Sequence, residues 1–134
     1  MIQPKELRIG NYVNVFDKID EIKSIDENEH GGFCKFKNNP YQYYLCHNGE
    51  ALIKPIILTE EILLKFGFSS RGTFWLDLYL DEKTKFTLGW HLDGRIDFEI
   101  SINKIYFDIS HIKHIHQLQN LFYSLTGEEL TFKN

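Results

Sequence analysis

Hydrophobic and polar residues alternate along four successive segments in the second half of the chain. A period of two is typical of a β-strand that buries one of its faces. The apolar positions of the alternation are Phe74, Leu76, Leu78, Leu80, Phe86, Leu88, Trp90, Leu92, Ile96, Phe98, Ile100, Ile102, Ile105, Phe107 and Ile109. The pattern therefore predicts a four-stranded antiparallel meander with one apolar face, which other elements must cover.

The turns of this meander can be checked by parity, because directly paired residues lie on the same face of a sheet. A two-residue turn at 103–104 pairs Ile102 with Ile105 and keeps the apolar residues together. A two-residue turn at 93–94 would instead place apolar residues opposite charged ones. We therefore expect a longer loop or a bulge there, although Asp-Gly is a common hairpin sequence.

A short helix precedes the meander. Thr59 is a good N-cap, and Glu60 and Glu61 lie in the first turn, where the helix dipole favours negative charge. Gly67 is suited to end the helix in the left-handed conformation. These signals predict a helix over 59–66.

A second helix is expected from about His111 to Thr126, with Ser110 as N-cap and Gly127 just past its end. One half of this helix is apolar and the other polar. The apolar half contains Ile112, Ile115, Leu118, Leu121, Phe122 and Leu125. We expect this helix and the 59–66 helix to pack on the apolar sheet face.

The first half of the chain is typical of short strands separated by turns. Gly, Asn and Pro interrupt the β-rich runs at 10–11, 31–32, 38–40 and 48–49. Five such strands suggest a small SH3-like β-barrel over residues 1–58. The expected fold is α+β: this barrel, followed in 59–134 by a helix, a four-stranded antiparallel meander and a C-terminal helix packed on one sheet face, the two subdomains forming one compact unit.

Composition restricts the class of protein. The 134 residues are 43% hydrophobic and 25% charged, a balance typical of a soluble globular chain, and the net charge of −4 disfavours non-specific nucleic-acid binding. Cys34 and Cys46 do not make a disulfide scaffold. No apolar run reaches the ~20 residues that cross a bilayer, and the first residues lack an apolar signal core. We therefore expect a reduced, cytoplasmic protein that does not enter a membrane.

The polar face of the predicted meander carries the strongest candidate surface. Its aromatic, basic and imidazole side chains are candidate binding residues: Trp75, Tyr79, His91, Arg95 and Tyr106. Gly89, in their midst, permits close approach of another group. Aromatic side chains among polar ones can bind a ligand or a partner protein. The alternative is that these aromatics form cross-strand pairs or pack against the N-terminal barrel.

Other candidate sites for chemistry have less support in the sequence. His111, His114 and His116 cannot all face one metal ion on a continuous helix, so we expect no metal site and no cofactor. Cys34 and His47 could be a nucleophile and its base, but a buried thiol is the simpler interpretation. The sequence has no P-loop, GxGxxG or GxSxG motif, and we expect no catalytic residues and no enzymatic activity.

A further cluster is basic and aromatic. Lys35 and Lys37 lie close in sequence to three tyrosines, Tyr41, Tyr43 and Tyr44, as in surfaces that stack single-stranded bases. Only two positive charges support this interpretation, so we do not expect nucleic acid as the main partner.

Three stretches of the sequence together resemble a family. They are ELRIGNYV from Glu6, PIILTEEILLKFGF from Pro55, and IKHIHQLQNLFYSLTGEEL from Ile112. They are similar to small uncharacterised proteins encoded by gut-bacterial phages, prophages and mobile elements. The resemblance implies an accessory protein in the cytoplasm of a bacterial host. It implies no catalytic residue.

The expected function is therefore a non-enzymatic binding module for a host or phage protein, or for a small ligand. A nucleic-acid-binding accessory protein is the alternative, and a metal-dependent enzyme is the third interpretation.

Overall fold

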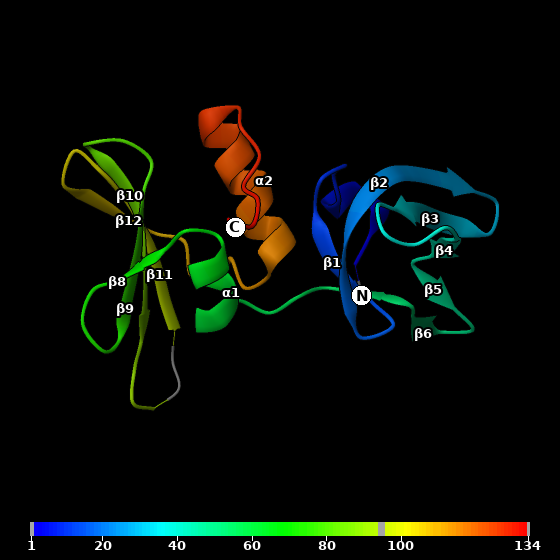
Figure 1. The fold of residues 1–134 in the computed structure, drawn as a ribbon, viewed down its shortest axis with the longest axis horizontal. Coiled ribbons are helices and arrows are strands. Elements are labelled where there is room, and N and C mark those ends of the chain that lie inside the picture. Colours follow the sequence, from blue (N-terminus) through cyan, green and yellow to red (C-terminus); the bar gives the residue numbers. More distant parts are fainter. Residues whose placement is uncertain (1, 94–95, 134) are drawn as a thin grey trace. The chain divides into compact units, whose positions relative to one another are not determined.

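A computed structural model describes residues 2–93 and 96–133 of the chain. Strands predominate, with two α-helices, so the predicted α+β class is confirmed. The chain divides into two compact units (Figure 1). The first contains the residues up to Ile57 together with His114–Glu129, and the second contains Leu58–Lys113 together with the residues from Leu130 onward.

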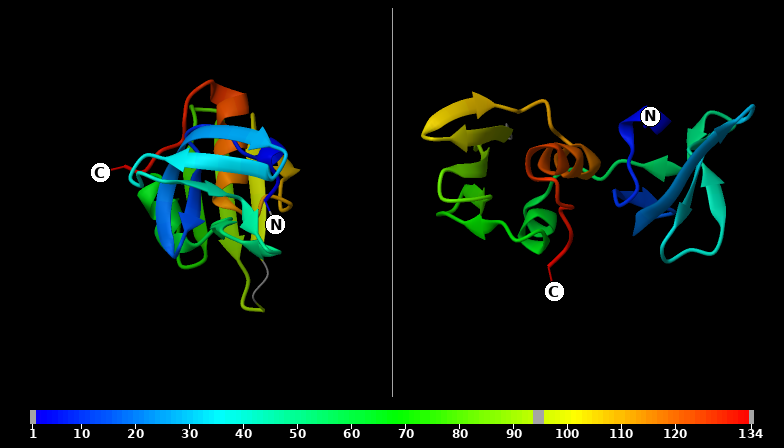
Figure 2. Two further views of the ribbon diagram at one scale, coloured as in Figure 1. Left: turned by 90° about the vertical axis from the view of Figure 1, so that its right-hand side faces the viewer. Right: turned by 90° about the horizontal axis from the view of Figure 1, so that it is seen from above.

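The first unit is built on a five-stranded sheet of order β4-β3-β2-β1-β7. Its elements are the 3-10 turn η1 (Pro4–Glu6), β1 (Tyr12–Val15), β2 (Lys18–Asn28), β3 (Gly31–Phe36), β4 (Gln42–Tyr44), β5 (Cys46–His47), β6 (Glu50–Ala51), β7 (Ile53–Lys54) and α2 (Ile115–Thr126). The long β2 pairs with β1 at one end and β3 at the other, as Figure 2 shows. A register shift between Ile22 and Ser24 marks a bulge between the two pairings.

The SH3-like barrel predicted for residues 1–58 is not confirmed. In the described part of the chain, β4 and β7 are the two edges of the sheet and do not pair with each other. The sheet therefore remains open. Its core is nonetheless a single apolar cluster, made of Ile2, Leu7, Val13, Val15, Ile22, Cys34, Phe36, Leu45 and Ile53.

The C-terminal helix α2 belongs to the first unit, whereas the sequence predicted that it covers the meander. Side-chain amides explain the difference. Gln119 accepts a hydrogen bond from the Tyr12 backbone N–H at 2.8 Å and donates one to the Gly10 carbonyl at 3.1 Å. Asn120 donates to the Glu6 carbonyl at 2.9 Å. These polar bonds join α2 to β1 and the segment before it.

The helix α2 also begins later than predicted. His114, not Ser110, is its N-cap, and the His114 N–H donates to Gln117 Oε1 at 3.0 Å. Ser110 instead accepts a hydrogen bond from the Phe98 N–H at 3.1 Å. The predicted end is confirmed, because Gly127 follows Thr126 in the left-handed conformation with φ 74°.

The second unit contains the predicted meander. Its elements are α1 (Glu60–Lys65), β8 (Ser69–Ser70), β9 (Trp75–Tyr79), β10 (Thr84–Trp90), β11 (Ile96–Ile102) and β12 (Ile105–Asp108). The sheet order is β12-β11-β10-β9-β8, with antiparallel pairing throughout. Only the short edge strand β8 was not expected. Thr59 caps α1 as predicted, with its Oγ1 accepting from the Ile62 N–H.

The register of the meander agrees with the parity analysis. Ile102 pairs with Ile105 across the turn at 103–104. Trp90 pairs with Ile96, so the connection spans residues 91–95 and is longer than two residues, as predicted. Residues 94–95 themselves lie outside the described residues.

The apolar face of the meander is buried at its centre but not everywhere. Its buried residues are Leu76, Phe86, Leu88, Phe98, Ile100 and Ile109. At the edge strand β12 the prediction of a covered face is wrong, because Ile105 and Phe107 are exposed.

Candidate ligand-binding surface

The register of the meander arranges its polar face in rows that cross the strands. Tyr79 on β9 pairs with Lys85 on β10, Lys85 with Ser101 on β11, and Ser101 with Tyr106 on β12. Adjacent strands lie ~4.8 Å apart, so the two tyrosines are roughly 14 Å apart, on either side of Lys85 and Ser101. This row of Tyr79, Lys85, Ser101 and Tyr106 is called here the tyrosine row.

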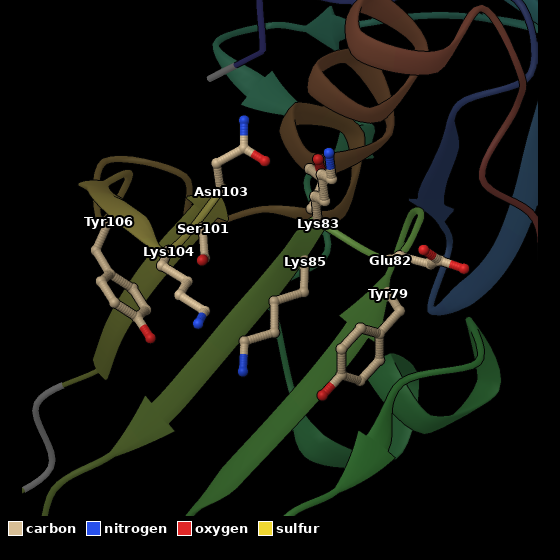
Figure 3. Close-up of a pocket in the computed structure, with 9 residues that line it drawn as sticks. Tyr79, Glu82, Lys83, Lys85, Ser101, Asn103, Lys104 and Tyr106 are labelled. Carbon is tan, nitrogen blue, oxygen red and sulfur yellow. The ribbon is translucent and has the colours of Figure 1, made fainter.

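A cavity of about 560 Å³ lies over the tyrosine row. The loop between β9 and β10 and the turn between β11 and β12 form its rim. Its lining residues are Tyr79, Glu82, Lys83, Thr84, Lys85, Ser101, Asn103, Lys104 and Tyr106 (Figure 3). A volume of this size is within the range of small-molecule sites.

Two ammonium groups extend into the space between the two phenol rings. Figure 3 shows Lys85 and Lys104 directed between Tyr79 and Tyr106, whereas Lys83 points the other way. The Lys85 Nζ is 5.6 Å from the centre of the Tyr79 ring, a cation–π contact. No carboxylate in the described part of the chain forms an ion pair with Lys85 or Lys104. The cavity is therefore positively charged and walled by aromatic rings.

A row of carboxylates lies next to the tyrosine row. Asp77, Thr87, Glu99 and Asp108 pair across the same four strands, two residues further along each. Asp77 is buried and accepts from Thr87 Oγ1 at 2.8 Å and from Arg71 Nε at 2.7 Å. The hydrogen bond to Asp77 raises the pKa of Arg71 above its ordinary value. Asp77 therefore has a structural role, while Glu99 and Asp108 leave negative charge beside the cavity.

Trp75 has a different role from Tyr79 and Tyr106. Its ring lies on Gly89, where an added Cβ would come within 2.5 Å of Trp75 Cζ3. The Arg71 guanidinium is 5.2 Å from the centre of a Trp75 ring. The group that approaches Gly89 is thus a side chain of the same sheet. Trp75 makes a cross-strand contact and does not line the cavity.

The other two predicted binding residues do not join the cavity either. His91 is hydrogen-bonded through Nε2 to the Asp97 carboxylate. Arg95 lies outside the described residues. Of the five predicted residues, the structure therefore brings Tyr79 and Tyr106 into one cavity.

The residues that sequence reasoning missed are Lys85 and Lys104. The parity argument already contained the signal for Lys85, because a residue one position from Phe86 must lie on the polar face. The position of Lys104 depends on the turn geometry, since Asn103 and Lys104 both have positive φ. Such a turn directs a side chain in a way that alternation alone does not reveal.

The histidine-rich segment supplies no group of metal ligands. His114 and His116 are stacked, with ring centres 5.8 Å apart, and His116 is buried. Burial lowers the pKa of His116, and neither of its ring nitrogens has a hydrogen-bond partner in the described structure. In residues 2–93 and 96–133, no three His, Cys, Asp or Glu side chains come together in a way that could hold a metal ion.

A second charged surface lies on the first unit. Lys23, Lys35 and Lys37 line a cavity of about 370 Å³ at the turn of Asn38, Asn39 and Pro40. The same turn borders a cavity of about 340 Å³ that Tyr41 and Tyr43 line. Lys35 and Lys37 on the one hand, and two of the three predicted tyrosines on the other, therefore line separate cavities that share the turn. The third, Tyr44, accepts a hydrogen bond from Asn28 Nδ2 at 3.0 Å and lines neither cavity.

The interpretation of Cys34 as a buried thiol is confirmed. Cys34 is fully buried, and burial raises the pKa of its thiol to about 11. A thiol with this pKa is protonated at neutral pH and is a poor nucleophile. Cys34 is part of the apolar core of the first unit.

Comparisons with known proteins give no match: no family model, no curated protein and no solved structure is significantly similar to this chain. Within the described residues, the helices are too short or too polar to traverse a bilayer. The geometry of the two charged cavities is therefore the basis for assigning a function.

Proposed function

We propose that this protein is a non-enzymatic binding module, and that its ligand is a small molecule or exposed side chain that carries an aromatic ring and a negative charge. The observation that supports this proposal is the tyrosine row, in which Lys85 and Lys104 extend between Tyr79 and Tyr106 without a carboxylate partner. An ammonium group without a carboxylate partner favours an anion, and a phenol ring favours a planar apolar group.

The size and surroundings of the cavity favour a small ligand over a polymer. The cavity measures about 560 Å³. Glu99 and Asp108 lie in the adjacent row and repel a polyanion that continues along the strands. These carboxylates lie roughly 7 Å further along the strands. They therefore do not contact a single anionic group that is bound between the two tyrosines.

The context that we propose is an accessory protein of a phage or mobile element in the cytoplasm of a bacterial host. The resemblance of the three stretches quoted above supports it. Both cysteines, Cys34 and Cys46, are free, which is compatible with a reducing compartment. We also propose an SH3-like relationship for the first unit, supported by its long β2 that pairs with both β1 and β3.

Titration of the ¹⁵N-labelled full-length protein with phenyl phosphate tests the proposal. We expect saturable amide shifts in residues 79–85 and 101–106, and no such shifts with phenol, which lacks the charge. Lys85→Met should weaken the binding roughly tenfold, because it removes one charged hydrogen bond. Tyr106→Ala should also weaken it.

The matched control is Lys5→Met, which removes an exposed lysine from η1 of the first unit. If phenyl phosphate shifts the same amides in Lys85→Met with unchanged affinity, the cavity is not the binding site. Inorganic phosphate distinguishes the two parts of the ligand, since it should bind more weakly than phenyl phosphate if a ring is recognised.

A second candidate function is single-stranded nucleic-acid binding by the first unit. The observation in its favour is that Lys23 joins Lys35 and Lys37 in one cavity, which raises the local charge above that apparent from the sequence. Binding of a fluorescent oligothymidylate should then weaken steeply with salt and be reduced by Lys35→Glu. Binding that is absent, or independent of salt, excludes this candidate.

A further inference from the structure

The edge strand β12 exposes all four of its residues. Ile105 is 60% exposed, Tyr106 61% and Phe107 51%, and Asp108 is exposed as well. Its inner side pairs with β11, while its outer side is the edge of the sheet. An exposed apolar edge strand offers unpaired backbone groups and apolar side chains to another strand.

The hairpin geometry identifies the backbone groups on the outer side. Ile102 and Ile105 flank a two-residue turn whose residues, Asn103 and Lys104, have φ 52° and 67°. The pair that flanks such a turn exchanges hydrogen bonds, and hydrogen-bonded pairs alternate along an antiparallel ladder. Ile105 and Phe107 therefore direct their N–H and C=O groups toward β11. Tyr106 and Asp108 direct theirs outward.

A second copy of the same strand can satisfy these outward groups in one register. When two β12 strands pair antiparallel about Tyr106, the N–H of each Tyr106 donates to the carbonyl of Tyr106 in the other copy. In this register Ile105 of one copy lies opposite Phe107 of the other, on the apolar face. Lys104 lies opposite Asp108 of the other copy at each end of the ladder, on the polar face.

Charge selects this register over its neighbours. A pairing centred on Ile105 would place Lys104 opposite Tyr106, and one centred on Phe107 would place Asp108 opposite Tyr106. Neither brings opposite charges together, whereas the pairing about Tyr106 forms two symmetric Lys104–Asp108 contacts. Registers centred between residues would place apolar side chains on the polar face.

We propose that the chain forms a two-fold symmetric dimer by antiparallel pairing of β12 with β12 of a second copy, centred on Tyr106. The two four-stranded meanders then form one continuous sheet. The exposed Ile105 and Phe107 side chains become apolar cross-strand neighbours. Tyr106 of the second copy continues the tyrosine row, whereas Lys104 of the second copy lies at the end of the adjacent row, opposite Asp108.

Disulfide trapping tests the register directly. In full-length protein with Cys46→Ser, a Tyr106→Cys substitution places the two thiols at a directly opposed pair whose Cα atoms are ~5.5 Å apart, within disulfide range. Mild oxidation should give a covalent dimer on non-reducing gels. Phe107→Cys is the matched control, because residue 107 lies opposite residue 105. It should not cross-link with itself but should cross-link with an Ile105→Cys chain.

Sedimentation equilibrium of the cysteine-intact protein over a concentration series tests the charge complementarity. We expect a monomer–dimer equilibrium whose dissociation constant rises at least tenfold in Lys104→Asp and in Asp108→Lys. An equimolar mixture of the two variants should dimerise about as well as the unsubstituted chain, because each brings the charges that the other lacks.

Three outcomes would overturn the proposal. The first is a monomer at all concentrations together with no cross-linking of Tyr106→Cys. The second is that the Phe107→Cys variant cross-links with itself as readily as the Tyr106→Cys variant does, which would indicate random collision. The third is a dimer that both charge variants leave unchanged, which would place the interface on another surface.

Discussion

At the scale of single residues, the polar face of the meander separates into side chains that build the sheet and side chains that remain available. Asp77 is buried with Thr87 and Arg71, and Trp75 lies on Gly89. Tyr79 and Tyr106 instead border a cavity. The cross-strand neighbour therefore determines whether an aromatic side chain on the polar face packs on the sheet or stays available for binding. Trp75 packs on the sheet because its neighbour, Gly89, has no side chain in the way of the ring.

Gly89→Ala should destabilise the protein by about 1–3 kcal/mol, the usual range for overpacking. The added Cβ would lie 2.5 Å from Trp75 Cζ3, so the ring or the strand must shift. Urea unfolding measures the change in the free energy of unfolding. In a Trp75→Ala background the same substitution should cost much less, because the ring it meets is gone. An equal cost in both backgrounds would contradict the contact.

At the scale of elements, the sequence predicts well those features that neighbouring residues determine. The helix at 59–66 has its cap, first-turn acids and stop signal within nine residues, and α1 is confirmed. The pairing of Ile102 with Ile105, and a connection of more than two residues after Trp90, follow from alternation and parity. The predicted beginning of α2 was wrong because a segment distant in sequence determines it. Residues 56–58 form backbone hydrogen bonds and an isolated β-bridge with residues 113–115, which keep the chain extended there.

The local sequence pattern also could not identify the sheet against which α2 packs. Amphipathicity predicts that a helix buries its apolar side, but it does not say against which sheet. The deciding groups are Gln119 and Asn120, which bond the backbone of residues 6–12. Gln119 is fully buried, although a side-chain amide is usually assigned to the solvent side of a helix. Sequence alone gives no measure of which polar residue will be buried.

The buried His116 of α2 should make the stability of the protein depend on pH. Burial and the nearby His114 lower the pKa of His116, and Glu6 opposes the shift only in part. The unfolded chain, with an ordinary pKa near ~6.5, then binds a proton more readily than the folded one. The stabilisation is present above pH ~6.5 and is lost as the pH falls below this value.

The measurement is the free energy of unfolding at pH 7.5 and pH 5.5 for the unsubstituted protein and for His116→Phe. The loss on acidification should be smaller in the variant, by up to about 1.4 kcal/mol per pH unit. His30→Gln is the matched control, because His30 is exposed. The same pH dependence in the unsubstituted protein and in His116→Phe would refute the role of this histidine.

At the scale of the whole molecule, the chain order and the compact units do not coincide. The residues after Ile57 leave the first unit, return to it at His114–Glu129, and leave it again from Leu130. The sequence predicted a division at 58/59, which separates residues 6–12 from the α2 amides that bond them. A unit assembled from two distant stretches should depend on both for its fold.

A fragment of residues 1–57 should therefore lack the native fold of the first unit. The Tyr12 N–H and the carbonyls of Gly10 and Glu6 lose the partners that Gln119 and Asn120 provide. Unsatisfied polar groups cost ~1–3 kcal/mol each when they are buried, which is a large part of the stability of so small a unit. The ¹⁵N spectrum of the fragment should show the narrow dispersion of an unfolded chain.

Adding a synthetic peptide of residues 112–129 in trans should restore the dispersed spectrum, because the peptide supplies the missing amides. A peptide with Gln119→Leu and Asn120→Leu keeps the length of the helix and its apolar side, and it should restore little. A fragment that is folded without any peptide would show that the sheet β4-β3-β2-β1-β7 is stable alone, and that α2 is an addition to it. Restoration by both peptides would instead assign the role of α2 to its apolar side chains.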